Sequence, residues 1–170
     1  MGRRGKGSPL LTPLASAKED AYRLLARRPR TRREMERYLK SRAYQEGTIQ
    51  EILDLLSSLN YLDDEAFARE WGRYRLETRP MGEQGLRREL RGKGVALNVI
   101  DAALRELFSE VDEGDLALRL AEQKARKGQE DSPVVARRRV RDFLLRRGFS
   151  FEATDDALRH VFGSDREPEI

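Results

Sequence analysis

Apolar residues along the chain recur at intervals of three and four positions, and few segments alternate apolar with polar residues. This spacing places apolar side chains on one face of an α-helix, whereas strict alternation is typical of a strand. The pattern therefore predicts an all-α protein. We expect helices over residues 16–27, 32–43, 49–58, 64–77, 83–93, 97–108, 113–127, 133–147 and 151–162.

Signals for helix starts support these bounds. Thr31–Glu34 and Thr48–Glu51 both have the spacing of a capping box, in which two side chains satisfy the first amides of a helix. Asp63 is placed to cap the helix that follows it. Ser132 precedes Pro133, and proline is favoured at the first helical position. Each of these residues predicts a helix start.

Two further signals concern helix boundaries, one at a start and one at C-terminal ends. Leu62 and Phe67 flank the cap at residue 63 with the spacing of a hydrophobic staple. Gly47, Gly94 and Gly148 follow periodic segments, and glycine is common just after the last residue of a helix. We expect a helix to end before each of the three glycines.

Three segments of the chain match one another. Leu39, Leu90 and Leu144 are each followed by basic residues, a small residue and an apolar residue, and these leucines are 51 and 54 positions apart. Apolar residues also return at equivalent places around each leucine: Met35, Tyr44, Ile52, Leu53 and Leu56; Leu86, Val95, Ala103, Leu104 and Leu107; Val140, Phe149, Ala157, Leu158 and Val161. Such periodicity indicates tandem units of about 50 residues, each with three helices.

Units this small bury little surface alone, so the sequence predicts three repeats stacked into an elongated, curved molecule. Flexible points are expected at 44–48, 78–82 and 128–132, and no spare heptad seam remains, which favours a monomer. The expected organisation is a disordered basic tail over 1–15, repeats over 16–60, 61–110 and 111–163, and a C-terminal tail over 164–170.

Composition narrows the possible chemistry. Charged and hydrophobic residues each make up 38% of the 170 residues, which predicts a thin core spread along the chain. The chain has no cysteine and one histidine, so disulfides, thiol catalysis and multi-histidine metal sites are excluded. We expect no cofactor. Because the N-terminus lacks a long apolar stretch and no apolar run could span a membrane, we expect a cytoplasmic protein.

Charge alternates in step with the repeats. Residues 21–42, 73–93 and 137–147 carry net charges of +7, +4 and +5, whereas residues 46–70, 101–115 and 150–170 carry −6, −5 and −4. The second helix of each repeat is thus basic and the third is acidic. Pairing between helices explains any single charge most simply. Three matched basic helices also suit a phosphate backbone or an acidic protein groove, and the pattern leaves both interpretations open.

Motifs for catalysis are weak. Asp63, Asp64 and Glu65 are consecutive on a helix start, so they point in different directions and favour capping over metal binding. His160 has Asp156 four residues earlier, which is typical of a surface contact. The segment 82–85 lacks the lysine and the preceding strand of a phosphate-binding loop. The sequence therefore predicts a protein that is not an enzyme.

Aromatic residues gather around the fourth predicted helix. Phe67, Trp71 and Tyr74 follow one helical stripe, and Tyr61 lies just before it. Thin units need apolar stripes to hold together, so we expect these four side chains to form the core of the central repeat. Stacking on nucleobases is the less favoured alternative.

The segment 61–75, Tyr-Leu-Asp-Asp-Glu-Ala-Phe-Ala-Arg-Glu-Trp-Gly-Arg-Tyr-Arg, resembles a signature of the RecX family of recombinase regulators. So does Arg79-Pro-Met-Gly82 followed by Leu86, Leu90 and Arg-Gly-Lys-Gly-Val95. The resemblance covers residues 17–162 and is weakest in the third repeat. It implies three tandem three-helix repeats. It also implies a bacterial protein that lies in the groove of the RecA filament, restrains filament growth, ATP hydrolysis and strand exchange, and can touch DNA.

Basic residues on the matched helices are the candidate contacts to recombinase or DNA: Arg27, Arg28, Arg32, Arg33, Arg79, Arg87, Arg88, Lys93, Arg137, Arg138 and Arg141. The motif residues Tyr61, Asp63, Asp64, Phe67, Trp71, Pro80 and Gly82 are expected to be structural, and Pro80 and Gly82 to shape the bend before the fifth helix. A stand-alone DNA-binding module and a helical adaptor without a DNA role are the alternatives.

Overall fold

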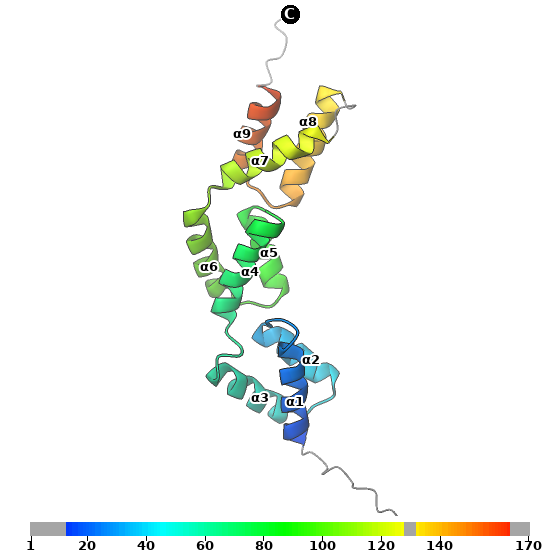
Figure 1. Ribbon diagram of the computed structural model, residues 1–170, viewed down its shortest axis with the longest axis vertical. Coiled ribbons are helices and arrows are strands. Elements are labelled where there is room, and N and C mark those ends of the chain that lie inside the picture. Colours follow the sequence, from blue (N-terminus) through cyan, green and yellow to red (C-terminus); the bar gives the residue numbers. More distant parts are fainter. Residues whose placement is uncertain (1–12, 128–131, 164–170) are drawn as a thin grey trace, which may run out of the picture. The chain divides into compact units, whose positions relative to one another are not determined.

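The structure is a computed structural model that describes residues 13–127 and 132–163, and within those residues it consists of nine α-helices without strands (Figure 1). The helices are α1 Pro13–Leu25, α2 Arg32–Ser41, α3 Glu46–Ser58, α4 Asp64–Thr78, α5 Glu83–Gly92, α6 Leu97–Glu110, α7 Glu113–Arg126, α8 Pro133–Arg146 and α9 Phe151–Phe162. Each predicted helix is present. Residues 128–131 of the expected flexible point at 128–132 lie outside the described residues, as do residues 1–12 of the expected N-terminal tail and the whole expected C-terminal tail, 164–170.

Two expectations at the third helix are wrong. We expected the capping box Thr48–Glu51 to start this helix and Gly47 to end the one before it, but α3 already begins at Glu46, with Gln45 as its N-cap. Glu46 accepts a hydrogen bond from Gln50 at 2.9 Å and pairs with Lys40 at 3.3 Å. An acidic residue in the first turn is favoured by the helix dipole, so Gly47 lies inside the first turn.

Other predicted helix starts are confirmed. Thr31 and Glu34 form the reciprocal capping box of α2, and the Asp63 carboxylate accepts from the amide of Ala66 at 2.9 Å. Ser132 is the N-cap of α8 with proline following it, although its side chain makes no capping hydrogen bond. The caps explain why α2 and α4 begin where the sequence predicts.

The three matched segments end their helices in the same way. Ala43, Gly94 and Gly148 have φ values of 60°, 83° and 79°, the left-handed conformation that closes a helix. The amide of the next residue then donates to the carbonyl of the matched leucine. These bonds join Tyr44 to Leu39, Val95 to Leu90 and Phe149 to Leu144, at 3.4, 3.2 and 3.2 Å. The repeat seen in the sequence is therefore a repeat of backbone geometry.

The described residues form two compact units, divided after Phe67 within α4. In the first unit, α1, α2 and α3 enclose one core, built on the aligned residues Met35, Leu39, Ile52, Leu53 and Leu56. In the second unit, Leu86, Leu90 and Leu104 are buried between α5 and α6, and α7, α8 and α9 enclose a cluster around Val140, Leu144 and Leu158. Each aligned apolar residue is buried except Tyr44 and Val161, which are partly buried.

Tyr44 is partly buried, and its hydroxyl donates a hydrogen bond to a buried carboxylate. Asp20 on α1 is 4% exposed and accepts from the Tyr44 hydroxyl at 2.8 Å and from Arg42 Nε at 3.1 Å. The hydrogen bond from Tyr44 lowers the pKa of Asp20 and, together with Arg42 and Arg23, outweighs the opposing effect of burial. This network fastens the turn between α2 and α3 to α1.

A carboxylate at the start of one repeat caps the second helix of the repeat before it. Asp64, the first residue of α4, accepts from the backbone amide of Arg32 at 2.9 Å. Glu113, the first residue of α7, accepts from the backbone amide of Glu83 at 2.8 Å. Because Arg32 and Glu83 both open a second helix, the two bonds are equivalent. They join consecutive repeats at the same point.

Within the second unit, the start of α5 packs directly against the turn between α8 and α9. The Gly82 amide donates to the Arg147 carbonyl at 3.2 Å, and Arg147 Nη1 donates to the Pro80 carbonyl at 2.7 Å. A Cβ on Gly85 would lie 2.2 Å from the Arg147 carbonyl oxygen, and one on Gly148 would lie 2.0 Å from the Gly85 nitrogen. Backbone meets backbone here, and only glycine leaves the space.

Candidate binding surface

The eleven predicted contact residues divide into two groups. Arg27, Arg33, Arg79, Arg88, Arg138 and Arg141 are exposed, whereas Arg28, Arg32, Arg87, Lys93 and Arg137 are half-buried. The exposed members lie on or beside α2, α5 and α8, the basic helices of the three repeats. Their role in contacting a partner stays a prediction.

Three of the half-buried arginines pair within the molecule. Arg28 donates to both carboxylate oxygens of Glu34, at 2.9 and 3.0 Å. Arg32 on α2 donates to Asp54 on α3 at 2.7 Å.

Arg87 on α5 makes the corresponding link in the second repeat. It hydrogen-bonds to Asp101 on α6 and, at 3.0 Å, to Glu83. Basic second helices are thus joined to acidic third helices by ion pairs in the first two repeats. Part of the charge alternation therefore serves the fold.

Lys93 belongs to a cluster around the single tryptophan. Its ammonium nitrogen lies 3.8 Å from the centre of the Trp71 ring, a cation–π contact. The Trp71 indole donates to Glu89 at 3.1 Å, and Arg75 Nε donates to the same carboxylate at 2.7 Å. Burial raises the pKa of Glu89, but the hydrogen bonds from Arg75 and Trp71 prevail and hold it below the usual range. The Glu89 carboxylate is therefore ionised, and the charge of Arg75 balances it.

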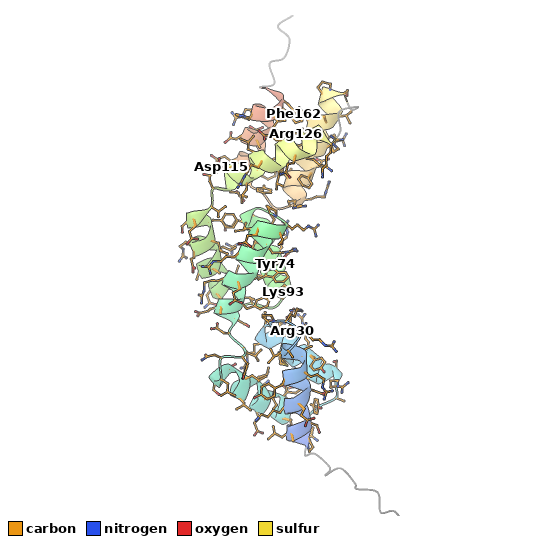
Figure 2. The ribbon with its side chains drawn as sticks, in the orientation of Figure 1. Arg30, Tyr74, Lys93, Asp115, Arg126 and Phe162 are labelled. Carbon is orange, nitrogen blue, oxygen red and sulfur yellow. The ribbon has the colours of Figure 1, made fainter. Side chains whose placement is uncertain are left out.

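The expectation that four aromatic residues form the core of the central repeat is wrong for two of them. Phe67 is buried and Trp71 is half-buried, but Tyr61 and Tyr74 are 54% and 53% exposed. Tyr61 contacts the edge of Tyr22 in the first unit. Tyr74 and Lys93, both labelled in Figure 2, each contact Trp71: the Tyr74 ring centre lies 5.9 Å from that of Trp71, and the Lys93 ammonium nitrogen lies 3.8 Å from it. Aliphatic side chains fill the core instead, so an aromatic side chain is left at the surface beside cations.

Four arginines line one pocket of about 310 Å³ in the second unit, which we call the arginine pocket. Arg79 and Arg88 come from the second repeat, and Arg146 and Arg147 from the end of α8. Sequence reasoning did not single out Arg146 and Arg147, because they belong to the matched segment that closes a helix in every repeat. Their position depends on the glycine contacts that bring α8 against α5.

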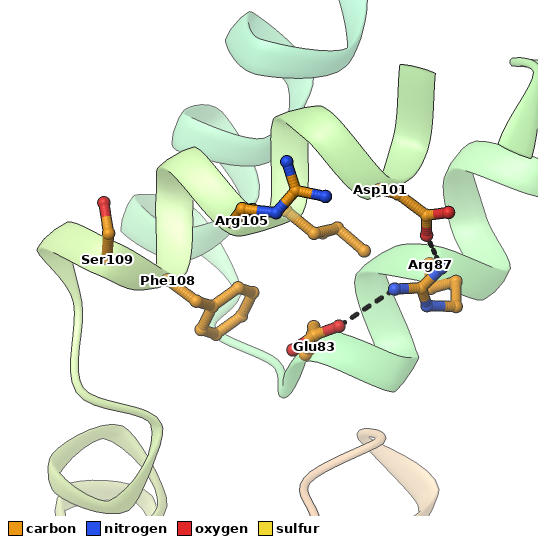
Figure 3. A pocket seen from close by; sticks show the side chains of 7 residues that line it. Glu83, Arg87, Asp101, Arg105, Phe108 and Ser109 are labelled. Carbon is orange, nitrogen blue, oxygen red and sulfur yellow. Dashed lines mark hydrogen bonds and ion pairs between the residues drawn. The ribbon is translucent and has the colours of Figure 1, made fainter. Parts of the chain in front are cut away.

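A second pocket, of about 450 Å³, has mixed charge. Figure 3 shows Arg87 between Glu83 and Asp101, with Arg105 and Phe108 on another side. Its acidic side chains already pair with Arg87. An anion would meet these carboxylates, so this hollow is a weaker candidate for binding one.

Other kinds of site receive no support in the part of the chain that the structure describes. Among these residues, no group of three or more histidine or acidic side chains could hold a metal ion. Residues 13–127 and 132–163 also contain no helix long and apolar enough to cross a membrane.

The fold and surface define a class: an all-α protein of tandem three-helix repeats, with basic residues concentrated on the second helices. Comparison with known proteins identifies the family. Family models described as the first, second and third three-helix domains of RecX match residues 17–56, 63–104 and 111–158. The chain belongs to the RecX family.

Individual relatives agree with this assignment. The chain is 34% identical to a protein named Regulatory protein RecX from Streptomyces coelicolor, over 87% of this chain and 78% of that protein. It is 35% identical to the protein of the same name from Mycolicibacterium smegmatis, over 89% and 82%. A crystal structure of RecX from Lactobacillus salivarius is similar with a TM-score of 0.75 and 27% identity, over 87% of this chain and 96% of that one. The family is a regulatory one and is not known as an enzyme family.

Proposed function

We propose that the protein binds the filament of the RecA recombinase and restrains filament growth, ATP hydrolysis and strand exchange. The observation that carries this proposal is the match of all three RecX domains in one chain. The exposed arginines on α2, α5 and α8 support it, because cations on matched elements suit an extended acidic surface. Direct contact with DNA is the second candidate, and the arginine pocket favours it.

Recombinase ATP hydrolysis on single-stranded DNA, titrated with the protein, tests the proposal. We expect inhibition, and we expect the double variant Arg33→Glu/Arg138→Glu to need about tenfold more protein for the same effect, since reversed charges oppose association. Both residues are exposed and lie on second helices. Arg87 is left unchanged because it joins α5 to α6.

The matched control is Arg105→Glu/Arg126→Glu, which reverses the same charge on α6 and α7. It should change the inhibitory concentration by less than about threefold. Equal losses in the two variants would refute the assignment to the second helices, and no effect of the unaltered protein on ATP hydrolysis would refute the function itself.

A further inference from the structure

We propose that an apolar pocket at the junction of the second and third repeats receives an apolar side chain of a recombinase subunit, flanked on its own chain by one carboxylate and one cation. This inference rests on the proposed function and names a contact that the arginines do not supply. The pocket, which we call the leucine pocket, measures about 440 Å³, roughly fifteen times the share of one water molecule in the liquid. Its apolar lining consists of Leu76, Pro80, Leu116 and Leu120.

The first argument is the apolar lining. Leu116, Arg119, Leu120 and Gln123 follow one another at intervals of three and four positions, so they share one face of α7. Leu116 is 6% exposed and belongs to the core of the third repeat, whereas Leu76 and Leu120 pack against that core and are only partly buried. The pocket therefore has a floor in the core and leucine walls that are incompletely covered. An apolar side chain that covers these walls would favour association.

The second argument is the charge around the pocket. Glu77 in α4 and Arg119 in α7 both line it and are both exposed. Neither forms an ion pair with any side chain of residues 13–127 and 132–163, and Arg119 Nε donates to the backbone carbonyl of Asp115 at 3.4 Å. The fold thus leaves one negative and one positive charge beside the pocket. Complementary charges on a partner would fix the register in which it docks.

The third argument is that the pocket is formed before a partner arrives. Arg147 Nη1 donates to the Pro80 carbonyl at 2.7 Å, and the Gly82 amide donates to the Arg147 carbonyl at 3.2 Å. These bonds hold the loop that contributes Pro80 against the third repeat, which contributes Leu116 and Leu120. A partner that meets a fixed surface loses less of its binding energy to ordering it.

These features together fit a protein segment better than a nucleic acid. A nucleic acid presents a row of negative phosphates, and the Glu77 carboxylate would repel them. A protein helix can present an apolar side chain with an acidic residue about one turn away on one side and a basic residue on the other. The leucine pocket therefore adds shape and both signs of charge to a surface whose other candidate contacts are all cations.

Recombinase ATP hydrolysis on single-stranded DNA, titrated with the full chain, tests the pocket. Gln123→Trp places a large ring at an exposed position of the lining, from which it can fill the pocket. We expect half-inhibition to need about tenfold more protein, since the partner's apolar side chain is then excluded. Asn98→Trp makes the same change from amide to indole at an exposed position of α6 and should alter this concentration by less than about threefold.

Charge variants test the same pocket independently. Glu77→Lys should raise the concentration for half-inhibition about threefold, because the partner's cation loses its counter-charge and meets a like charge. Attraction to DNA or to a purely acidic surface predicts the opposite, since the added lysine would then strengthen inhibition. Glu70→Lys makes the same substitution at an exposed position of α4 outside the lining, and it should not weaken inhibition.

Two results would overturn the proposal. One is equal inhibition by Gln123→Trp and the unaltered protein although the fluorescence of the added indole shows that its ring is buried. The other is unchanged or stronger inhibition by Glu77→Lys, and this result alone decides if the added ring stays in solvent. Circular dichroism verifies that each variant is folded. Inhibition that neither variant weakens would refute the pocket alone, whereas no inhibition by the unaltered protein would refute the proposed function.

Discussion

At the scale of single residues, the same left-handed backbone conformation closes the second helix of each repeat, but the residue that adopts it is glycine in two repeats and alanine in the first. Gly94 and Gly148 close α5 and α8 with positive φ, and Ala43 does the same after α2. A residue with a Cβ in this conformation places that atom close to the following carbonyl oxygen. The first repeat therefore carries strain that the other two avoid. Ala43 is exposed, so its methyl group gains little from packing.

We predict that Ala43→Gly stabilises the first unit. Relief of the left-handed conformation is worth roughly 1–2 kcal/mol, and the added freedom of glycine in the unfolded chain offsets part of it, which leaves a gain of about 0.5–1 kcal/mol. Gly94→Ala is the reverse change at the equivalent position and should cost about 1 kcal/mol. Urea unfolding followed by circular dichroism measures both. Destabilisation by Ala43→Gly would contradict this account.

At the scale of helices, two consecutive acidic residues at the start of a repeat cap two different helices. Asp63 and Asp112 cap their own helices, accepting from amides three residues on at 2.9 Å. The next residues, Asp64 and Glu113, cap the second helix of the preceding repeat. The sequence predicted capping for this cluster, and capping is what the structure shows. The reach to another repeat was not predicted, because only the fold brings α2 beside the start of α4.

We predict that the cap of α2 needs the oxygen of Asp64 more than its charge. Burial raises the pKa of Asp64, and the hydrogen bond from Arg32 only partly opposes this. A raised pKa means that ionising Asp64 costs folding stability. The stability that the protonated side chain contributes is full below its ordinary pKa and is lost as the pH rises through its pKa in the folded protein. Asp64→Asn keeps an acceptor without the charge.

Asp64→Ala removes the acceptor as well and should cost about 1 kcal/mol, whereas Asp64→Asn should stay within about 0.5 kcal/mol of the unaltered protein at pH 7. The free energy of unfolding from urea titrations compares the two variants. Equal cost in both would show that the charge itself stabilises α2, against this prediction.

The nine helices within residues 13–127 and 132–163 could be predicted because each carries the three-and-four spacing of apolar residues over several turns. The start of α3 could not, since Gln45 offers no capping signature and Thr48 offers a false one. For the candidate surface, the sequence located the basic helices but could not show that Arg28, Arg32 and Arg87 pair within the fold. Partners far apart in sequence are set by packing.

At the scale of the whole molecule, the second and third repeats share one compact unit because their backbones touch. Gly82 and Gly85 at the start of α5 meet Arg147 and Gly148 after α8. This contact also forms the arginine pocket, since it brings cations of both repeats around one space. Gly82 lies in the segment that resembles a family signature, and we expected it to shape a bend before the fifth helix. The structure adds the reason: a side chain there would meet the Gly148 carbonyl oxygen at 2.3 Å.

Substitutions at two glycines in α5, Gly85 and Gly92, can distinguish the effect of this close contact from the general destabilising effect of glycine in a helix. A Cβ on Gly85 would lie 2.2 Å from the Arg147 carbonyl oxygen, whereas one on Gly92 would meet nothing within 4 Å. Gly85→Ala should therefore cost about 1–3 kcal/mol through overpacking, although alanine favours helices. Gly92→Ala should gain up to about 1 kcal/mol. Thermal unfolding followed by the fluorescence of Trp71 reports on this unit, and if Gly85→Ala also raised the melting temperature, the second and third repeats would not be held together by this close backbone contact.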